Sequence, residues 1–376
     1  MPYKLNPEAF SPGDYIREEI DARGWTQADL ATILGRDSKD VNELINAKRA
    51  VTPDTAKQLA EAFGTSAELW MNLESSYQLS RATQANSGVA HRAKIYSIAP
   101  ISYMQRRGWI EPTENPEILE AQVCKFFNIG SIDESIRFQY PARRPGSLAL
   151  NQFQLAWLYR ARHLALAAPV TNTFSARTLE LALVELSKLK ANPEDLRRIP
   201  KVLSEAGIRF IIIEPLPRTK TDGACFWLDR KSPVVVLSMR YDRIDWFWHT
   251  LIHELAHVKN GDGMEEPTVD SQLVGDDAQP NDEKHEGEKR ADEFAASFLV
   301  DPHALQGFID RVAPLYSHIK IMNFAQKRGV HPGIVVGQLQ RRQEIKYAHS
   351  RRMLVRVRGL VTPSALTDGW RHMAGL

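Results

Sequence analysis

Residues 249–257 read H-T-L-I-H-E-L-A-H, and this stretch decides the fold that we expect for the C-terminal half of the chain. Residues four positions apart lie on one face of an α-helix, so His253 and His257 can bind the same metal ion. Glu254 would lie beside that ion, where a carboxylate can take a proton from a water molecule. The sequence therefore predicts a zinc site with Glu254 as general base, on a helix over about 244–259. The alternative is that both histidines are purely structural.

A catalytic zinc site needs a third protein ligand and an open fourth position. The later segment 285–292 offers four candidates, which are His285, Glu286, Glu288 and Asp292. We favour Glu288, because the run E-K-R-A-D places it one helical turn before Asp292, which could then accept a hydrogen bond from a ligand histidine. Glu286 is the main rival. The alternative for Glu288 and Asp292 is that they are charges favoured at the start of a helix by its dipole.

Before this motif the pattern changes from helical to β-branched. Runs at 208–213, 224–228 and 234–237 are typical of strands, and the strand at 224–228 could pair with an extended peptide. His249 could donate to a substrate oxyanion or to a ligand carboxylate, or it could be a helix-face residue with its own partner. We expect an α+β, mostly helical chain whose C-terminal domain is zincin-like, with a small sheet and an H-E-x-x-H helix.

The N-terminal segment 27–46 has the layout of a helix-turn-helix. Thr26 and Asp29 form the pattern of a capping box, Ser38 is expected to cap the next helix, and apolar residues such as Ile33 would pack the two helices together. The outer face would expose polar side chains that read base edges or hold phosphates. The predicted DNA contacts are Gln27, Ser38, Lys39, Asn42, Lys48 and Arg49.

Composition limits the classes of protein and of metal site. The net charge is +2, but residues 1–80 hold 13 acidic and 8 basic side chains, so DNA binding there would need a local basic patch. Two cysteines exclude a disulfide framework and a four-thiolate zinc site, so His, Asp or Glu must hold any metal. We find neither a signal peptide nor an apolar run long enough to span a membrane, and we expect a cytoplasmic protein with no membrane partner.

Several blocks of the C-terminal half occur in an order known from one family. They are G-A-C-F-W-L-D at 223–229, P-V-V-V-L-S-M-R-Y-D-R at 233–243, F-W-H-T-L-I-H-E-L-A-H at 247–257, E-K-R-A-D-E-F-A-A-S-F-L-V-D-P at 288–302 and H-P-G-I-V-V-G-Q-L-Q at 331–340. Over about 205–340 the chain resembles the ImmA/IrrE metallopeptidases. The resemblance implies that His253, His257 and Glu288 bind zinc and that Glu254 is the general base. Asp292 departs from the asparagine that is common there. Many members cleave a repressor or regulator, which implies a protein substrate.

The N-terminal segment carries a second resemblance. Its blocks are S-P-G-D-Y-I-R-E-E-I at 11–20, W-T-Q-A-D-L-A at 25–31, V-T-P-D-T-A-K-Q-L-A at 51–60 and F-G-T-S-A-E-L-W-M-N-L-E at 63–74. Over roughly 8–79 they look like HigA-type antitoxin domains of the Cro/repressor (XRE-type) superfamily. That resemblance implies a homodimer that binds a palindromic operator, with a toxin as a further partner.

These patterns predict five segments. They are a helix-turn-helix domain at 8–79, a linker at 80–95, a helical connecting region at 96–205, a metallopeptidase domain at 206–340 and a basic tail at 341–376. We expect a DNA-binding regulator with a zinc endopeptidase that cleaves or controls a repressor or antitoxin-type protein. One alternative is a HigA-like antitoxin or transcription factor whose peptidase fold is only a sensor or is inactive. Another is a peptidase whose N-terminal bundle docks the substrate.

Overall fold

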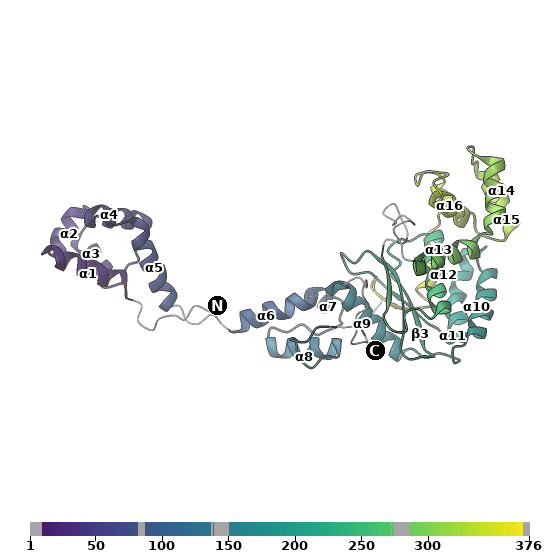
Figure 1. Cartoon of the computed structure of the whole chain (residues 1–376), viewed down its shortest axis with the longest axis horizontal. Coiled ribbons are helices and arrows are strands. Elements are labelled where there is room, and N and C mark those ends of the chain that lie inside the picture. The colour runs from purple at the N-terminus through teal and green to yellow at the C-terminus, as the bar shows by residue number, and fades with distance from the viewer. Residues whose placement is uncertain are drawn as a thin grey trace. The chain divides into compact units, whose positions relative to one another are not determined.

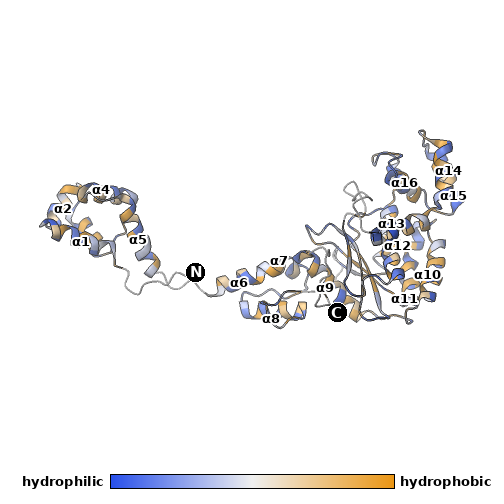
Figure 2. Ribbon diagram, viewed as in Figure 1, coloured by the Kyte–Doolittle hydropathy of each residue, from blue (hydrophilic) through white to orange (hydrophobic). Residues whose placement is uncertain are grey.

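The computed structural model describes residues 10–81, 87–136, 138, 150–271, 273 and 286–370 (Figure 1). The chain divides into two compact units, Met1–His91 and Arg92–Leu376, and each is described by itself. The chain is mostly helical, and the second unit contains a small mixed sheet. Helices of both units carry hydrophobic and hydrophilic residues on the same helix (Figure 2), as expected for helices that bury one face. No helix of the described residues is long and apolar enough to cross a membrane.

The N-terminal unit is a bundle of short helices. They are α1 (Pro12–Arg23), α2 (Gln27–Leu34), α3 (Ser38–Ile45), α4 (Pro53–Phe63) and α5 (Ala67–Arg81). Thr26 and Asp29 form the predicted capping box at the start of α2. The predicted cap of α3 is wrong by one residue, because Asp37 is the N-cap and Ser38 is already the first helical residue.

The helix-turn-helix has an apolar core between α2 and α3. Leu30, Ala31, Leu34 and Val41 are buried in it, as predicted. The prediction that Ile33 packs between the two helices is wrong, because 48% of its surface is exposed. At about 100° of rotation per residue, position 33 lies well away from the face that positions 30, 31 and 34 share. Ile33 therefore belongs to the surface of the unit.

The sheet of the C-terminal unit has the strand order β4-β2-β3-β1-β5. Its strands are β1 (Arg209–Ile213), β2 (Thr221–Trp227), β3 (Pro233–Leu237), β4 (Thr268–Ser271) and β5 (Leu366–Asp368). β1 runs parallel to β3 and β5, and β2 runs antiparallel to β3 and β4. Strands β1 and β3 lie where the β-branched runs predict them, and β2 contains most of the third predicted strand, 224–228. Strands β4 and β5 are not predicted, because four and three residues are too few to show the pattern of a strand.

Strand β2 does not offer an edge to a peptide, so the prediction made for 224–228 is wrong. β3 pairs with one edge of β2, and β4 pairs with the other. The outer strand on this side of the sheet is β4. An extended peptide would therefore have to pair with β4.

Side chains of the central strands alternate between two hydrophobic cores. Phe210 and Ile212 face one core, and Ile211 and Ile213 face the other. The first core contains residues of α10 (Ala176–Lys188), η1 (Pro193–Arg198), α11 (Ile199–Glu205), α12 (Ile244–Asn260), α13 (Glu286–Leu299), α14 (Pro302–Val312), α15 (His318–Arg328), α16 (Pro332–Arg341), η3 (Arg351–Met353) and α17 (Arg358–Val361). The second contains residues of α6 (Ser87–Ile98), α7 (Ile101–Arg106), α8 (Pro116–Phe127) and α9 (Gln152–Ala167).

The predicted connecting region 96–205 is not separate from the predicted peptidase domain 206–340. Helices α7 to α9 cover one face of the sheet, and α10 and α11 pack into the core on its other face. A sheet whose strands are apolar on both sides needs this double cover. The boundary between the two compact units falls instead between His91 and Arg92, within the predicted linker 80–95. Residues 82–86 of that linker lie outside the described residues.

The predicted basic tail 341–376 is part of the same unit as far as it is described. Strand β5 pairs with β1, and Val357 and Val361 are buried in the first core. Asp368 is 1% exposed, forms an ion pair with Arg160 of α9, and accepts a hydrogen bond of 3.2 Å from Nε1 of Trp109. Most of the basic residues that suggest a tail come before these buried positions, between residues 341 and 356.

Candidate metal centre and DNA-contact helix

Helix α12 carries the H-E-x-x-H motif and is buried along almost all of its length. Its bounds, Ile244–Asn260, agree with the predicted helix, and Gly261 ends it in the left-handed conformation. Leu251, Ile252 and Leu255 pack into the first core, which fixes the rotation of the helix. This rotation points His253 and His257 in one direction, with their Nε2 atoms 3.1 Å apart.

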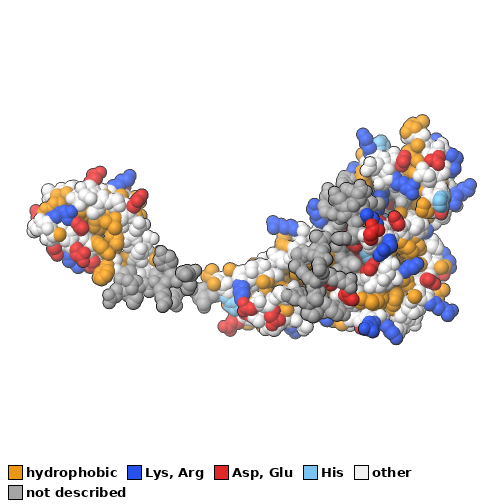
Figure 3. Space-filling view, in the orientation of Figure 1, with side chains coloured by type: hydrophobic (Ala, Val, Ile, Leu, Met, Phe, Trp, Pro, Cys, Tyr) orange, Lys and Arg blue, Asp and Glu red, His pale blue; other side chains and the backbone are white. Residues whose placement is uncertain are grey.

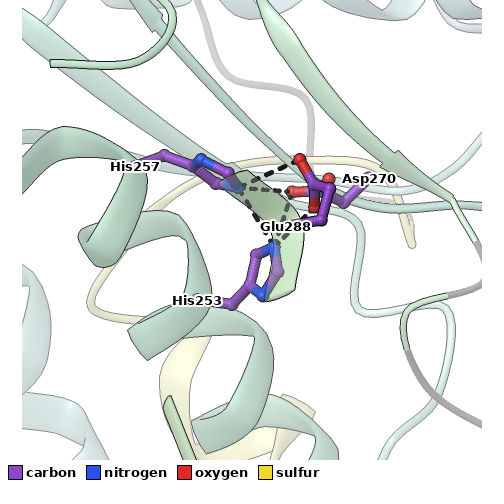
Figure 4. A group of neighbouring side chains, drawn as sticks. All are labelled: His253, His257, Asp270 and Glu288. Carbon is purple, nitrogen blue, oxygen red and sulfur yellow. Dashed lines mark hydrogen bonds and ion pairs between the residues drawn. The ribbon is translucent and has the colours of Figure 1, made fainter. Parts of the chain in front are cut away.

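Two carboxylates approach the same point as the histidines (Figure 4). Glu288, from the first turn of α13, lies 3.2 Å from Nε2 of His253 and 3.6 Å from Nε2 of His257. Asp270, from β4, lies 3.3 Å and 3.7 Å from the same two nitrogens. The predicted ligands His253, His257 and Glu288 are thus brought together. Asp270 is a neighbour that the sequence analysis missed.

Each histidine is held through its other ring nitrogen. Nδ1 of His253 lies 3.0 Å from Oδ1 of Asp292, and Nδ1 of His257 lies 3.0 Å from Oδ2 of Asp262. A carboxylate accepts the hydrogen bond, so Nδ1 carries a proton, and in the neutral ring Nε2 is the nitrogen whose lone pair can bind a metal. Asp292 therefore occupies the place predicted for it. Asp262 was missed, although it follows His257 directly after the glycine that ends α12.

The four side chains fit a tetrahedral zinc ion. Bonds of roughly 2.0–2.1 Å in that geometry place ligand atoms about 3.3 Å apart, and the distance between the two Nε2 atoms and the four distances from them to the carboxylates range from 3.1 to 3.7 Å. Oδ2 of Asp270 is buried and has no hydrogen-bond partner among the described residues. Lone pairs and carboxylates this close repel unless a positive charge lies between them. The donor set is also one that zinc accepts, with imidazole nitrogens and carboxylate oxygens.

The pKa shifts of the ligands reflect an excess of negative charge in a buried site. Burial lowers the pKa of His253, but Asp270, Asp292 and Glu288 outweigh it and raise that pKa well above its usual value. Burial is likewise outweighed at His257, whose pKa rises to about 9, mainly through Asp262 and Glu288. Burial alone would raise the pKa of Glu288, but its contacts with the two histidines lower it. The site is therefore suited to a cation.

Glu254 lies fully buried beside this point, and neither of its carboxylate oxygens has a hydrogen-bond partner among the described residues. Burial, and next the charge of Asp270, raise the pKa of Glu254 well above its usual value. The carboxylate rests on Gly223 of β2, where a Cβ atom would lie 2.8 Å from Cδ of Glu254. Gly223 is thus required for Glu254 to approach the sheet. The sequence analysis missed this role, which depends on the packing of α12 against β2.

His249, one turn before His253, belongs to a second group with His253 and Asp292. Nε2 of His249 lies 3.3 Å from Oδ1 of Asp292 and contacts Nη1 of Arg341. Burial, and next the charge of Arg341, lower the pKa of His249 to about 3, so its ring is neutral. The guanidinium already supplies a positive charge to this second group. His249 therefore has partners of its own, which agrees with the alternative stated for it.

The main rival ligand, Glu286, lies elsewhere. Glu286 is exposed and pairs with Lys289 at 3.2 Å, away from the histidines. His285 lies outside the described residues. On the face shown in Figure 3, basic, acidic and hydrophobic side chains are interspersed over the C-terminal unit. The charges of the centre converge below the surface, since His253, His257 and Asp270 are buried.

The predicted DNA contacts all lie on the surface of the N-terminal unit. Gln27 is the first residue of α2, and Ser38, Lys39 and Asn42 share the exposed face of α3. Asn42 accepts a hydrogen bond of 2.6 Å from Nδ2 of Asn46. The exposed residues that follow α3 include two of the predicted contacts, Lys48 and Arg49.

Arg49, one of these predicted contacts, is already paired with a charged residue of the same unit. Its guanidinium forms an ion pair with Asp40 of α3. Asp40 thus lowers the positive charge that Arg49 offers to a phosphate. Fewer free positive charges are therefore available for DNA on this unit than the sequence implies.

Comparisons with known proteins find similarity in the N-terminal unit. The helix-turn-helix family HTH_3 matches residues 16–70. "Virulence-associated protein I" of Dichelobacter nodosus is 33% identical over 82 residues, which are 22% of this chain and 76% of that protein. The "Uncharacterized HTH-type transcriptional regulator YddM" of Escherichia coli (strain K12) is 30% identical over 71 residues, which are 19% of this chain and 76% of that protein.

Solved structures resemble the same part of the chain. One is "Pseudomonas aeruginosa antitoxin HigA with higBA promoter", with 34% identity, a TM-score of 0.20, and coverage of 20% of this chain and 83% of that chain. Another is an addiction module antidote protein of a HigA family from Coxiella burnetii, with 33% identity, a TM-score of 0.20 and the same two coverages.

Proposed function

This chain belongs, through its N-terminal unit, to the helix-turn-helix family, and we propose that it is a DNA-binding transcription regulator that also carries a zinc-dependent endopeptidase site. The exposed polar face of α3 and the relative named as a transcriptional regulator support the first part. The metal centre on α12 supports the second part.

One observation carries the peptidase proposal. Two buried imidazoles direct their Nε2 atoms to a point that Glu288 also reaches, while carboxylates hold both Nδ1 atoms. Carboxylates behind ligand histidines are typical of metal sites, because they fix the tautomer and the ring orientation. Glu254 lies next to this point with an unpartnered carboxylate, which a purely structural site would not need.

Each of these residues has a separate role in the proposed hydrolysis. A zinc ion held by His253, His257 and Glu288 would supply Lewis-acid activation of water and of a peptide carbonyl. Glu254 takes a proton from the attacking water and passes it to the nitrogen of the departing amine. Asp292 keeps His253 oriented throughout.

The proposed substrate is a protein, of the repressor or antitoxin type. The helix-turn-helix would bring the peptidase to operator DNA, where such regulators are bound. A second copy of this chain is a proposed partner, since operators that such domains bind are read by dimers. A toxin is a further proposed partner, and it rests only on the resemblance to HigA-type domains.

A second candidate function is that of an antitoxin-like transcription factor whose peptidase fold senses a ligand or is inactive. The position of Asp270 favours it, since this carboxylate lies 3.3 Å from Nε2 of His253, on the open side of the predicted ligand set. A site with four protein ligands is typical of structural zinc.

The test of the proposed function compares wild type with Glu254→Gln. We expect the purified full chain to hold one zinc ion, measured by elemental analysis, and the variant to hold the same amount. Proteomics of cells that express either form should reveal a regulator that only the wild type cuts. Zinc in both forms without any difference in cleavage would favour the second candidate. Absence of zinc from the wild type would refute the peptidase.

A further inference from the structure

Asp270 matches Glu288 in its distance from both histidines. Its Oδ2 atom lies 3.3 and 3.7 Å from the two Nε2 atoms, against 3.2 and 3.6 Å for the oxygens of Glu288 (Figure 4). Asp270 is also the more buried of the two, with a side chain 7% exposed against 29% for Glu288. Asp270 thus meets every geometric condition by which Glu288 is taken as a ligand.

The sheet explains why Asp270 reaches the centre. Asp270 pairs with Gly223 across β2 and β4, next to an irregularity in the register. The carboxylate of Glu254 rests on that same glycine. Asp270 therefore lies beside Glu254 as well as beside the histidines. This is the region that a water molecule must occupy if Glu254 is to take its proton.

We propose that Asp270 is the fourth protein ligand of the metal centre, and that it closes the position that a catalytic site leaves open. The proposal rests on the proposed function, because it assumes that the centre holds zinc. With four protein ligands the site is closed, as in structural zinc sites. Peptide hydrolysis then requires Asp270 to leave, so that water can enter beside Glu254.

Strand β4 is a suitable element for such a release. It has four residues and lies at the edge of the sheet, where β2 is its paired strand among those described. Short edge strands open at a lower free energy than the interior of a sheet. The other ligands lie on α12 and α13, which pack into the first core. A displacement of β4 would therefore open the site and leave His253, His257 and Glu288 in place.

The test needs no knowledge of the substrate. Zinc affinity is measured for the full chain and for Asp270→Asn by competition with a chelator. The absorption spectrum of each cobalt-substituted form is then recorded with increasing azide, a small anion that binds only where a coordination position is open. We expect Asp270→Asn to bind zinc at least about tenfold more weakly. We also expect azide to change the cobalt spectrum of Asp270→Asn at concentrations that leave wild type unaltered.

Controls separate the possible failures. Glu286→Gln, an exposed neutralisation at the start of the same helix as Glu288, should match wild type in both measurements. Thermal unfolding of the zinc-free proteins shows whether Asp270→Asn is folded, and Asp270→Ser serves as a second variant that lacks the carboxylate. Equal azide binding by wild type and Asp270→Asn, or equal zinc affinity, would overturn the proposal. A wild-type chain that binds no zinc would overturn the proposed function and this proposal with it.

Discussion

Arg341 and Asp292 form an ion pair behind the metal centre, with Nη2 of the arginine 2.6 Å from Oδ2 of the aspartate. The other oxygen of Asp292 lies 3.0 Å from Nδ1 of His253. Arg341 ends α16, and Asp292 and His253 belong to α13 and α12. The pair thus links three helices at the point where a predicted zinc ligand is oriented. Arg341, the first residue of the predicted basic tail, therefore has a structural role in this unit.

The first prediction concerns this pair. Arg341→Met removes the charge that holds Asp292, so His253 loses part of its orientation, and zinc affinity should fall about tenfold to a hundredfold. Chelator competition measures the change. Arg342→Met is the matched control, because Arg342 contacts Gln306 at 3.2 Å and not Asp292. Equal zinc affinities in the two variants would contradict a role for Arg341 at the centre.

The second prediction concerns the third ligand. Glu288→Gln replaces an anionic oxygen donor by a neutral amide, and we expect the zinc content of the purified protein to fall well below one ion per chain. Elemental analysis after dialysis gives the stoichiometry. Glu293→Gln, an exposed change on the same helix, should keep full zinc content. Unchanged zinc in Glu288→Gln would eliminate Glu288 as a ligand.

The third prediction concerns Gly223. Its substitution by alanine places a Cβ atom against the carboxylate of Glu254, which must then move away from the sheet. We expect hydrolysis of the identified substrate to fall by about 10²–10⁴-fold, the range that a general base contributes. Zinc content should stay near that of wild type, because the ligands are not displaced. Gly287→Ala, where an added Cβ meets no atom within 4 Å, is the control and should remain active.

The fourth prediction concerns stability. Asp368→Asn removes the charge of a carboxylate that pairs with the buried Arg160, and the free energy of unfolding should fall by up to about 3–5 kcal/mol. Urea unfolding of the full chain measures it. Glu185→Gln breaks the exposed pair with Lys188, in which both side chains are about half exposed, and should change the stability by less than about 1 kcal/mol. A small effect of Asp368→Asn would mean that β5 contributes little to the fold.

The fifth prediction concerns DNA. Lys48→Ala should weaken binding to the DNA upstream of the protein's own gene and reduce the slope of log affinity against log salt by about 1, as expected for the loss of one phosphate contact. Asn42→Ala should instead relax the choice of sequence, because Asn42 lies on the exposed face of α3. Fluorescence anisotropy at several salt concentrations measures both effects. Lys57→Ala, an exposed change on α4, should leave the affinity unaltered.

The features that depend on residues a few positions apart could be predicted from the sequence. The period of an α-helix aligns His253 with His257 and separates Glu288 from Asp292 by one turn, so the sequence alone could predict the three proposed ligands and the carboxylate behind His253. Capping residues and glycines determine in the same way where helices of the N-terminal unit begin and end. These are interactions between residues a few positions apart, and backbone geometry relates them directly.

Tertiary structure decided the rest. Asp270 reaches the centre through the pairing of β4 with β2, and Gly223 matters because α12 packs against that strand. Arg341 lies 49 positions after Asp292 in the chain and meets it only when α16 and α13 are in place. The same holds for Asp368, which is buried because β5 pairs with β1. Such contacts depend on how distant elements pack, and no short-range pattern of residues encodes that packing.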